Sequence, residues 1–304
     1  MHHGRRRFIA SMLVLPLTLY GVFVLSPYAQ AFYLSLTDWR GFSAQANFVG
    51  LDNFARLFDD ELFWRALRNN GILLAVVPAL TVALGLFIAA LLNFGGKRRS
   101  GGFAHAGGAN FYKVVTFFPL LLSVSIVGVL WQFVYTPNNG LLNGVLDAVG
   151  LDGLERSWLA DPATALPAVI VVMIWSSLGF YVVLFSAAMQ SVPSDVLEAA
   201  ALDGAGQVAT FWRVTLPLVW DSVQVALVYL GVAALDGFAL IQIMTVGPGG
   251  PDGATEVLAL SLWRNAFSYG RFSYATAMGV TLFFLTMTLA LLTFRVSRRE
   301  RIEL

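Results

Sequence analysis

Long apolar segments constrain this chain more than any other feature of its sequence. A helix that crosses a lipid bilayer needs about 20 mostly apolar residues, and segments of at least that length recur along the chain, separated by short polar stretches. The predicted membrane-spanning helices are residues 8–36, 69–94, 113–135, 166–190, 217–244 and 272–295. The stretches between them are too short for a soluble domain. We therefore expect an all-α integral membrane protein with six transmembrane helices, in which residues 1–304 form a single transmembrane domain.

The composition agrees with a membrane protein. Of the 304 residues, 58% are hydrophobic and 12% charged, whereas about a quarter of the residues in a soluble domain are charged. The net charge of +1 gives no reason to expect a nucleic-acid partner. Because the chain has 0 cysteines, disulfides, thiolate metal sites and cysteine nucleophiles are excluded. The histidines have no zinc-ligand spacing, and we expect no metal.

The first apolar segment has an alternative interpretation as a signal peptide. Arg5, Arg6 and Arg7 precede it, and the sequence Ala-Gln-Ala at 29–31 resembles a signal-peptidase site. However, the apolar part of a signal peptide has only about 7–15 residues, and the run here continues well beyond that. We interpret the segment as a retained span.

The distribution of lysine and arginine predicts the orientation. If the N-terminus is cytoplasmic, the segments on the cytoplasmic side hold more basic residues than those on the outer side. This is the bias that the positive-inside rule describes. Both termini are therefore expected in the cytoplasm.

The loop at 191–216 departs from that bias. It would lie in the cytoplasm, yet it carries Asp195, Glu198 and Asp203 against a single basic residue, Arg213. Membrane insertion gives no reason for an acidic loop on this side. A connector between two spans remains one interpretation, and a docking site for another protein is the other.

Local rules predict two short helices within this loop. Ser194 is a good N-cap residue for the first, and Gly204 suits its C-terminal stop, where a left-handed backbone is needed. The second would cover residues 206–216 and place Phe211 and Trp212 where they could lie along the membrane surface.

The loop also carries a family motif. Residues 198–217 resemble the EAA signature of the permease subunits of binding-protein-dependent ABC importers, which is E-A-A, three residues, glycine, nine residues, isoleucine, one residue, leucine and proline. In this chain the matching residues are Glu198, Ala199, Ala200, Gly204, Leu216 and Pro217, with Val214 in place of isoleucine.

The resemblance extends over nearly the whole chain. The stretches at 48–70, 158–180, 189–205 and 245–267 are similar to the carbohydrate-uptake branch of the family, and to the first permease of the pair, as in the maltose transporter. Departures are a long glycine-rich loop at 95–112, Asp221 where proline is common, and no counterpart of the extra N-terminal helices of the maltose permease.

This resemblance implies a type I ABC importer permease fold and a function. The chain would translocate a sugar or oligosaccharide into the cytoplasm by alternating access, in a bacterial-type inner (plasma) membrane. Its partners would be a second permease subunit in a heterodimer, two cytoplasmic ATPase subunits and an external sugar-binding protein. The ATPase-coupling residues would be Glu198, Ala199, Ala200, Asp203, Gly204, Leu216 and Pro217.

The chain is not expected to hydrolyse ATP itself. The fragment Asn93–Ser100 resembles a phosphate loop, but it lacks the first glycine of that motif, and Arg98 follows Lys97 where serine or threonine is required. We expect no catalytic residue and no cofactor on this chain, with ATP and magnesium bound by the partner subunits.

Polar and aromatic residues within the spans are candidates for the substrate path, because polar groups are costly near the bilayer midplane. They are Trp175, Ser176, Ser177, Phe180, Tyr181, Asp236 and Gln242. Helix packing is the alternative role for the serines and aromatic residues, and Asp236 could instead pair with the second permease. Trp131, Gln132 and Tyr135 are either a further part of the path or an interfacial aromatic belt.

Two outer segments are candidates for contact with the external protein or the translocation path. These are the glycine- and proline-rich loop at 247–255 and, more weakly, the 37–68 region with Asn69 and Asn70.

An ion-gradient-driven secondary transporter is the alternative function. That class often shows internal repeats and buried charge relays. This sequence has one EAA stretch without a second copy, and few charges within its spans. A membrane enzyme has no catalytic dyad or metal cluster to support it.

Overall fold

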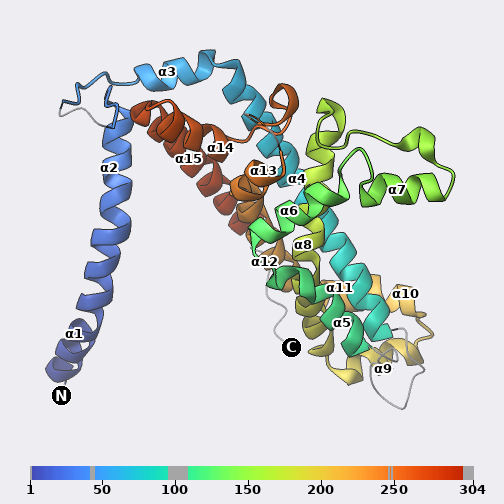
Figure 1. Ribbon diagram of the computed structural model, residues 1–304. Coiled ribbons are helices and arrows are strands. Elements are labelled where there is room, and N and C mark those ends of the chain that lie inside the picture. Colours follow the sequence, from blue (N-terminus) through green and yellow to red (C-terminus); the bar gives the residue numbers. More distant parts are fainter. Residues whose placement is uncertain (1, 42–44, 95–108, 246, 248, 297–304) are drawn as a thin grey trace. The chain divides into compact units, whose positions relative to one another are not determined.

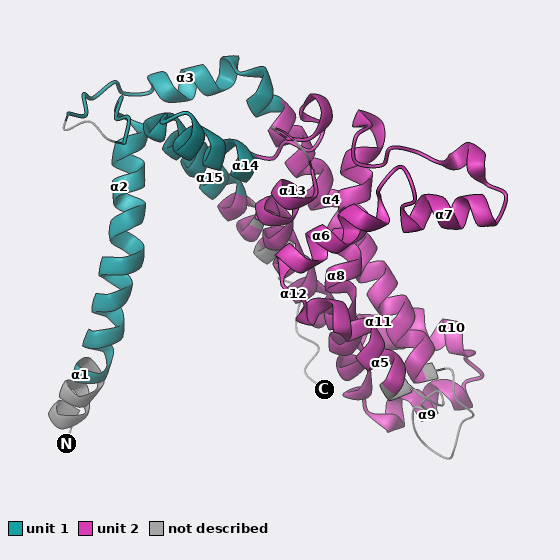
Figure 2. Ribbon diagram, in the orientation of Figure 1, with its two compact units in different colours: residues 1–64, 258–285 teal, residues 65–257, 286–304 magenta. Residues whose placement is uncertain are grey.

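The fold is helical throughout the part of the chain that the computed structural model describes, namely residues 2–41, 45–94, 109–245, 247 and 249–296 (Figure 1). Most of the glycine-rich loop, with the fragment that resembles a phosphate loop, and the basic C-terminal end lie outside these residues. The chain forms two compact units, residues 1–64 with 258–285, and residues 65–257 with 286–304 (Figure 2).

The first unit combines the N-terminal helices with the start of the last long helix. α1 (His2–Tyr20) continues through a π-helical turn (Gly21–Leu25) into α2 (Ser26–Ser35). The remaining elements are α3 (Asp52–Asp59), α14 (Leu258–Trp263), a π-helical turn (Arg264–Ser268) and most of α15 (Phe272–Val296). The rings of Tyr28 and Phe32 on α2 lie 5.6 and 5.7 Å from the ring of Phe283 on α15, so aromatic contacts hold α2 against α15.

The second unit contains the longest helices. Its elements are α4 (Glu61–Phe94, whose first four residues belong to the first unit), α5 (Ala109–Phe117), α6 (Val124–Val134), α7 (Leu141–Ala148), α8 (Pro162–Gln190), α9 (Ser194–Leu202), α10 (Gln207–Thr210), α11 (Leu216–Leu218), α12 (Trp220–Leu235) and α13 (Phe238–Met244). α5, α12 and α13 all pack against α8, so α8 is the central helix of this unit.

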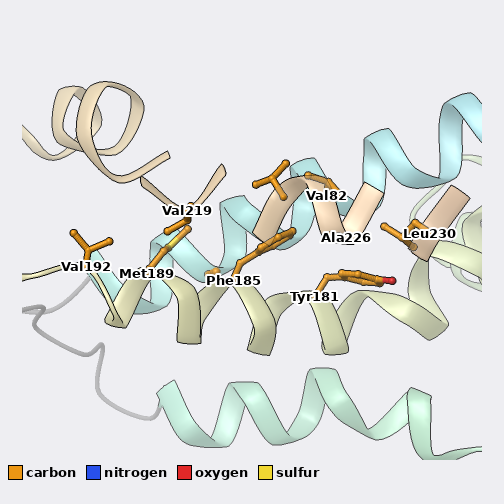
Figure 3. Close-up of a cluster of buried hydrophobic side chains, with 10 residues drawn as sticks. Val82, Tyr181, Phe185, Met189, Val192, Val219, Ala226 and Leu230 are labelled. Atoms are coloured by element: carbon orange, nitrogen blue, oxygen red, sulfur yellow. The ribbon is translucent and has the colours of Figure 1, made fainter. Parts of the chain in front are cut away.

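The core of the second unit lies between α8 and its neighbours α4 and α12. The rings of Tyr181 and Phe185 rise from α8 toward Val82 of α4 and Ala226 of α12 (Figure 3). Phe185 is fully buried. Within lipid, helices associate through close packing rather than through expulsion of water, so the fit of these side chains holds the three helices together.

Three described helices are long and apolar enough to cross a membrane: Ser11–Ser35, Glu61–Asn93 and Pro162–Gln190. They contain most of the predicted spans 8–36, 69–94 and 166–190. The predicted span 272–295 falls on α15, of which Phe272–Thr288 is the apolar part.

Two predicted spans are interrupted helices rather than continuous ones. In the region 113–135, α5 and the 3-10 turn after it meet α6 at 101°. Pro119 begins this break because proline cannot donate a backbone hydrogen bond, and Ser123 restarts the helix as the N-cap of α6, accepting a bond from the amide of Ile126. The region 217–244 is bent by 70° at Val219, between α11 and α12, and α12 then ends before α13 begins.

Gly179 allows α5 and α8 to approach each other closely. A β-carbon at this position would lie 1.9 Å from the carbonyl oxygen of Thr116 and 2.6 Å from the α-carbon of Phe117. Both atoms belong to the backbone, which cannot rotate away as a flexible side chain can.

Replacing Gly179 with alanine should therefore force the two helices apart. Overpacking of this kind costs about 1–3 kcal/mol, and we expect the upper end of that range in thermal unfolding of the detergent-solubilised protein. The matched control is Gly71→Ala on α4, where an added β-carbon meets nothing within 4 Å. Equal unfolding temperatures for the two variants would contradict the close approach.

Candidate functional site

The EAA segment, residues 194–217, lies between two predicted spans and begins with a short helix, α9. The helix begins one residue earlier than it would if Ser194 were its N-cap. Pro193 occupies the N-cap position with φ −56° and ψ 135°, and Ser194 is the first helical residue. The prediction of Ser194 as N-cap is therefore wrong. The ring of Pro193 already fixes an extended backbone suited to the position before a helix, and the Ser194 hydroxyl instead lies 3.4 Å from the carboxylate of Asp195.

Gly204 ends α9, as predicted. Its φ of +80° is left-handed, a region that costs other residues about 1–2 kcal/mol. The amide of Gly204 donates to the carbonyl of Ala201 at 3.1 Å, and the amide of Ala205 donates to the carbonyl of Ala200 at 2.9 Å. These two bonds form a Schellman motif, which stops the helix sharply after Asp203.

One side of the EAA segment is anchored in the unit's core. Leu197 of α9, and Phe211 and Leu216 beyond it, pack against the buried cluster around Phe185. These contacts fix the segment to the end of α8 and the start of α12. Movement of the segment would therefore be transmitted to those helices.

The other side of the segment is open. Glu198, Ala199 and Asp203 are exposed. Leu202 is 89% exposed and Trp212 is 63% exposed. An acidic patch next to exposed apolar side chains is a surface that suits contact with another protein.

The segment leads directly into α12 through a rigid bend. Leu216 is partly buried and Pro217 is exposed. Val219, where the chain turns by 70°, is buried in the same cluster as Phe185. The bend is therefore held by packing.

The five candidate residues on α8 differ in their surroundings. The hydroxyls of Ser176 and Ser177 both donate to the carbonyl of Met173, at 3.0 and 2.8 Å. Each hydroxyl proton is therefore already used in a hydrogen bond within its own helix. Tyr181 is only 7% exposed and belongs to the core cluster. Phe180, one residue earlier, is 45% exposed. Of these two rings, Phe180 is the one available to a ligand.

Asp236 lies at the break between α12 and α13. It is the C-cap residue of α12, and its side chain is exposed. A β-carbon on the next residue, Gly237, would lie 3.0 Å from the methyl carbon of Met173, so the break faces the turn of α8 whose carbonyl holds Ser176 and Ser177. The structure thus places the break that follows Asp236 against the Met173 side chain of α8, while Gln242 is exposed further along α13.

Trp131 and its neighbours connect three helices. The ring of Trp131 on α6 lies 5.3 Å from the ring of Trp175 on α8. The Gln132 side chain donates to the carbonyl of Ile243 on α13 at 2.5 Å, and the Tyr135 hydroxyl donates to the carbonyl of Ala168 at 3.2 Å. These residues brace helices within the protein.

Sequence reasoning missed the role of Asn69. Its buried side-chain amide donates to the carbonyls of Ala254 and Glu256, at 3.0 and 2.9 Å, and so fastens the glycine-rich loop at 247–255 to α4. The only signal in the sequence was an asparagine at the start of a predicted apolar span. Among the described residues, no group of three or more histidine, aspartate or glutamate side chains is placed to hold a metal ion.

Comparison with known proteins decides the family. The family model of the inner membrane component of binding-protein-dependent transport systems matches residues 65–302. The chain belongs to this family. The permease is 46% identical to a diacetylchitobiose uptake system permease protein of Streptomyces coelicolor, over 97% of this chain and 83% of the relative.

Two further likenesses agree. A multiple sugar-binding transport system permease protein of Streptococcus mutans is 32% identical, over 95% of this chain and 94% of the relative. The fold matches a chain of a bacterial ABC transporter for the import of alginate, with a TM-score of 0.81 at 25% identity, over 99% and 98% of the two chains. The type I ABC importer permease fold is therefore confirmed, and a secondary transporter is not supported.

The helix stop at Gly204 can be tested directly. Gly204→Ala should loosen the end of α9 and accelerate amide hydrogen exchange at residues 204 and 205 by about tenfold, because about 1–2 kcal/mol of backbone strain is added. Gly206→Ala is the matched control, since Gly206 has φ −71° and nothing lies within 4 Å of an added β-carbon. The same acceleration in both variants would contradict the motif.

Proposed function

We propose that this permease moves a sugar or oligosaccharide, delivered by an external binding protein, into the cytoplasm of a bacterial cell. The observation that carries the proposal is the EAA segment, which packs against the core on one face and is exposed on the opposite face. The sugar assignment draws on relatives named for diacetylchitobiose and for multiple sugars.

The EAA segment would be the docking point of an ATPase subunit. Glu198 would make polar contacts, Ala199 and Ala200 would let the partner approach closely, and Asp203 would extend the acidic patch. Gly204 would fix the end of the docking helix. Leu216 and Pro217 would carry its displacement into the bend at Val219 and so into α12.

The proposal includes further subunits. Two cytoplasmic ATPase subunits would bind ATP and magnesium, and a second permease subunit would complete the cavity as a heterodimer. Both termini would lie in the cytoplasm, with the chain crossing the inner membrane several times. The chain itself would hold no ATP site.

The substrate path would pass the break between α12 and α13. Interrupted helices at membrane depth are tolerated where they line a cavity. Asp236 could accept hydrogen bonds from two adjacent sugar hydroxyls, Phe180 could stack on the apolar face of a sugar ring, and Ser176 and Ser177 retain lone pairs that can accept a further bond. Trp175 and Gln242 are further candidates, whereas the burial of Tyr181 favours a packing role.

A charge reversal in the docking helix tests the coupling. In reconstituted vesicles containing all subunits, Glu198→Lys should abolish ATP-dependent sugar uptake while the complex stays in the membrane, because a cation would replace the acidic contact. The matched control is Asp147→Lys, which reverses an exposed charge on α7, outside the segment. Normal uptake with Glu198→Lys, or equal loss with both variants, would defeat the assignment.

Removal of the carboxylate at the helix break tests the path. Asp236→Leu should raise the sugar concentration for half-maximal uptake, or lower the maximal rate, by about tenfold or more, since hydrogen bonds to charged groups contribute about 1.5–3 kcal/mol. Asp221→Leu, which removes another exposed carboxylate of the same helix, should have a much smaller effect. Unchanged affinity and rate with Asp236→Leu would exclude a contact with substrate.

A further inference from the structure

The first unit contains an open polar cleft that the proposed path does not include. Its volume is about 910 Å³, within the range of about 300–1,000 Å³ typical of small-molecule sites. Three segments line it: residues 38–40 after α2, the inner face of α3 with Asp60, and residues 269–274 at the start of α15. The sequence places these segments on the outer side of the membrane.

Buried polar groups hold the floor of the cleft in place. The side-chain amide of Asn53 donates to the carbonyls of Ser35 and Thr37, at 2.8 and 2.7 Å. The hydroxyls of Thr37 and Ser273 lie 3.0 Å apart in a hydrogen bond, and the amide of Ser273 donates to the carbonyl of Trp39 at 3.1 Å. Asn53, Thr37 and Ser273 are all buried, so the three segments are fixed before any ligand arrives.

Two carboxylates of the cleft are also fixed in direction. The Tyr274 hydroxyl donates to Asp60 at 2.6 Å. Asp38 accepts bonds from the side-chain amide and the backbone amide of Asn47, at 3.1 and 2.8 Å. Together these bonds lower the pKa of Asp38 below its ordinary value, and the side-chain bond is the larger cause.

The charges of the cleft balance. Arg40, Arg56 and Arg271 face Asp38, Asp59 and Asp60 around it, a mixture that favours neither an anion nor a cation. Guanidinium groups supply donors and carboxylates supply acceptors, which together match the hydroxyls of a neutral sugar.

Aromatic rings complete this chemistry. Trp39, Tyr269 and Tyr274 line the same cleft, and the guanidinium carbon of Arg271 lies 5.7 Å from the centre of the Tyr269 ring. The flat apolar face of such a ring can cover the C–H face of a sugar, while the phenol hydroxyl remains able to form a hydrogen bond.

We propose that this cleft is a second, outer site for a neutral oligosaccharide, separate from the path at Asp236. The proposal rests on the proposed function, because it takes the transported sugar class as its ligand. The site would hold sugar at the outer face, beside the outer end of the predicted span 272–295.

The test uses the purified full-length chain in detergent, without a binding protein, and saturation-transfer NMR with diacetylchitobiose as the probe. We expect saturable binding, at least fivefold weaker in Arg56→Ala/Arg271→Ala and unchanged in Arg156→Ala, an exposed arginine outside the cleft. Saturable binding should persist in Asp236→Leu, because the cleft does not contain this residue. An acidic disaccharide, digalacturonate, should gain no affinity over diacetylchitobiose, because the arginines and the carboxylates of the cleft balance each other.

Three outcomes would overturn the proposal. The first is no saturable sugar binding by a wild-type chain whose circular dichroism shows it to be folded. The second is binding that Asp236→Leu abolishes and the double arginine variant does not, which would place the sugar in the membrane path. The third is unchanged sugar binding in the double variant together with lost binding of the cognate external protein, which would make the cleft a protein-docking surface. Failure of the proposed function would show separately, as uptake that needs neither ATP nor the external protein.

Discussion

The packing of α8 against α4 and α12 around Phe185 is the contact on which the second unit depends. Leu197, Phe211 and Leu216 of the EAA segment pack against this cluster on one side, and the break at Asp236 follows the end of α12. Close packing is nearly incompressible, so a displacement at one edge of such a core is passed on rather than absorbed. The EAA segment and the break at Asp236 therefore belong to one packed body.

The end of α9 at Gly204 and the family of the chain could be predicted from the sequence because their signals are local. Gly204 lies where the end of the helix needs a left-handed backbone conformation, which glycine adopts readily. The spacing from Glu198 to Pro217 matches the family motif. Ser194 was misplaced for a related reason: capping rules favour its hydroxyl, but the fixed backbone of Pro193 takes the cap position. The interruption of the predicted span 113–135 was also missed. Hydropathy is averaged over many residues, so a single proline such as Pro119 barely changes it, although a regular helix is broken there.

Other features depend on tertiary contacts and could not be predicted. Helical spacing put Tyr181 and Phe180 on different faces, but only the positions of α4 and α12 show that the face with Tyr181 is packed and the other open. The outer cleft is the strongest case. Residues 38–60 and residues 269–274, which line it, are more than 200 residues apart in the chain, and the hydrogen bond between Thr37 and Ser273 joins the two regions.

The exposed apolar side chains of the EAA segment also affect the chain before it is assembled. Leu202 is exposed as long as no partner covers it, and exposed apolar groups favour aggregation and recognition by chaperones and proteases. An unassembled copy would therefore display its own signal for removal. In the proposed docking, the ATPase subunit would cover this side chain, so the lifetime of the chain would depend on the supply of that partner.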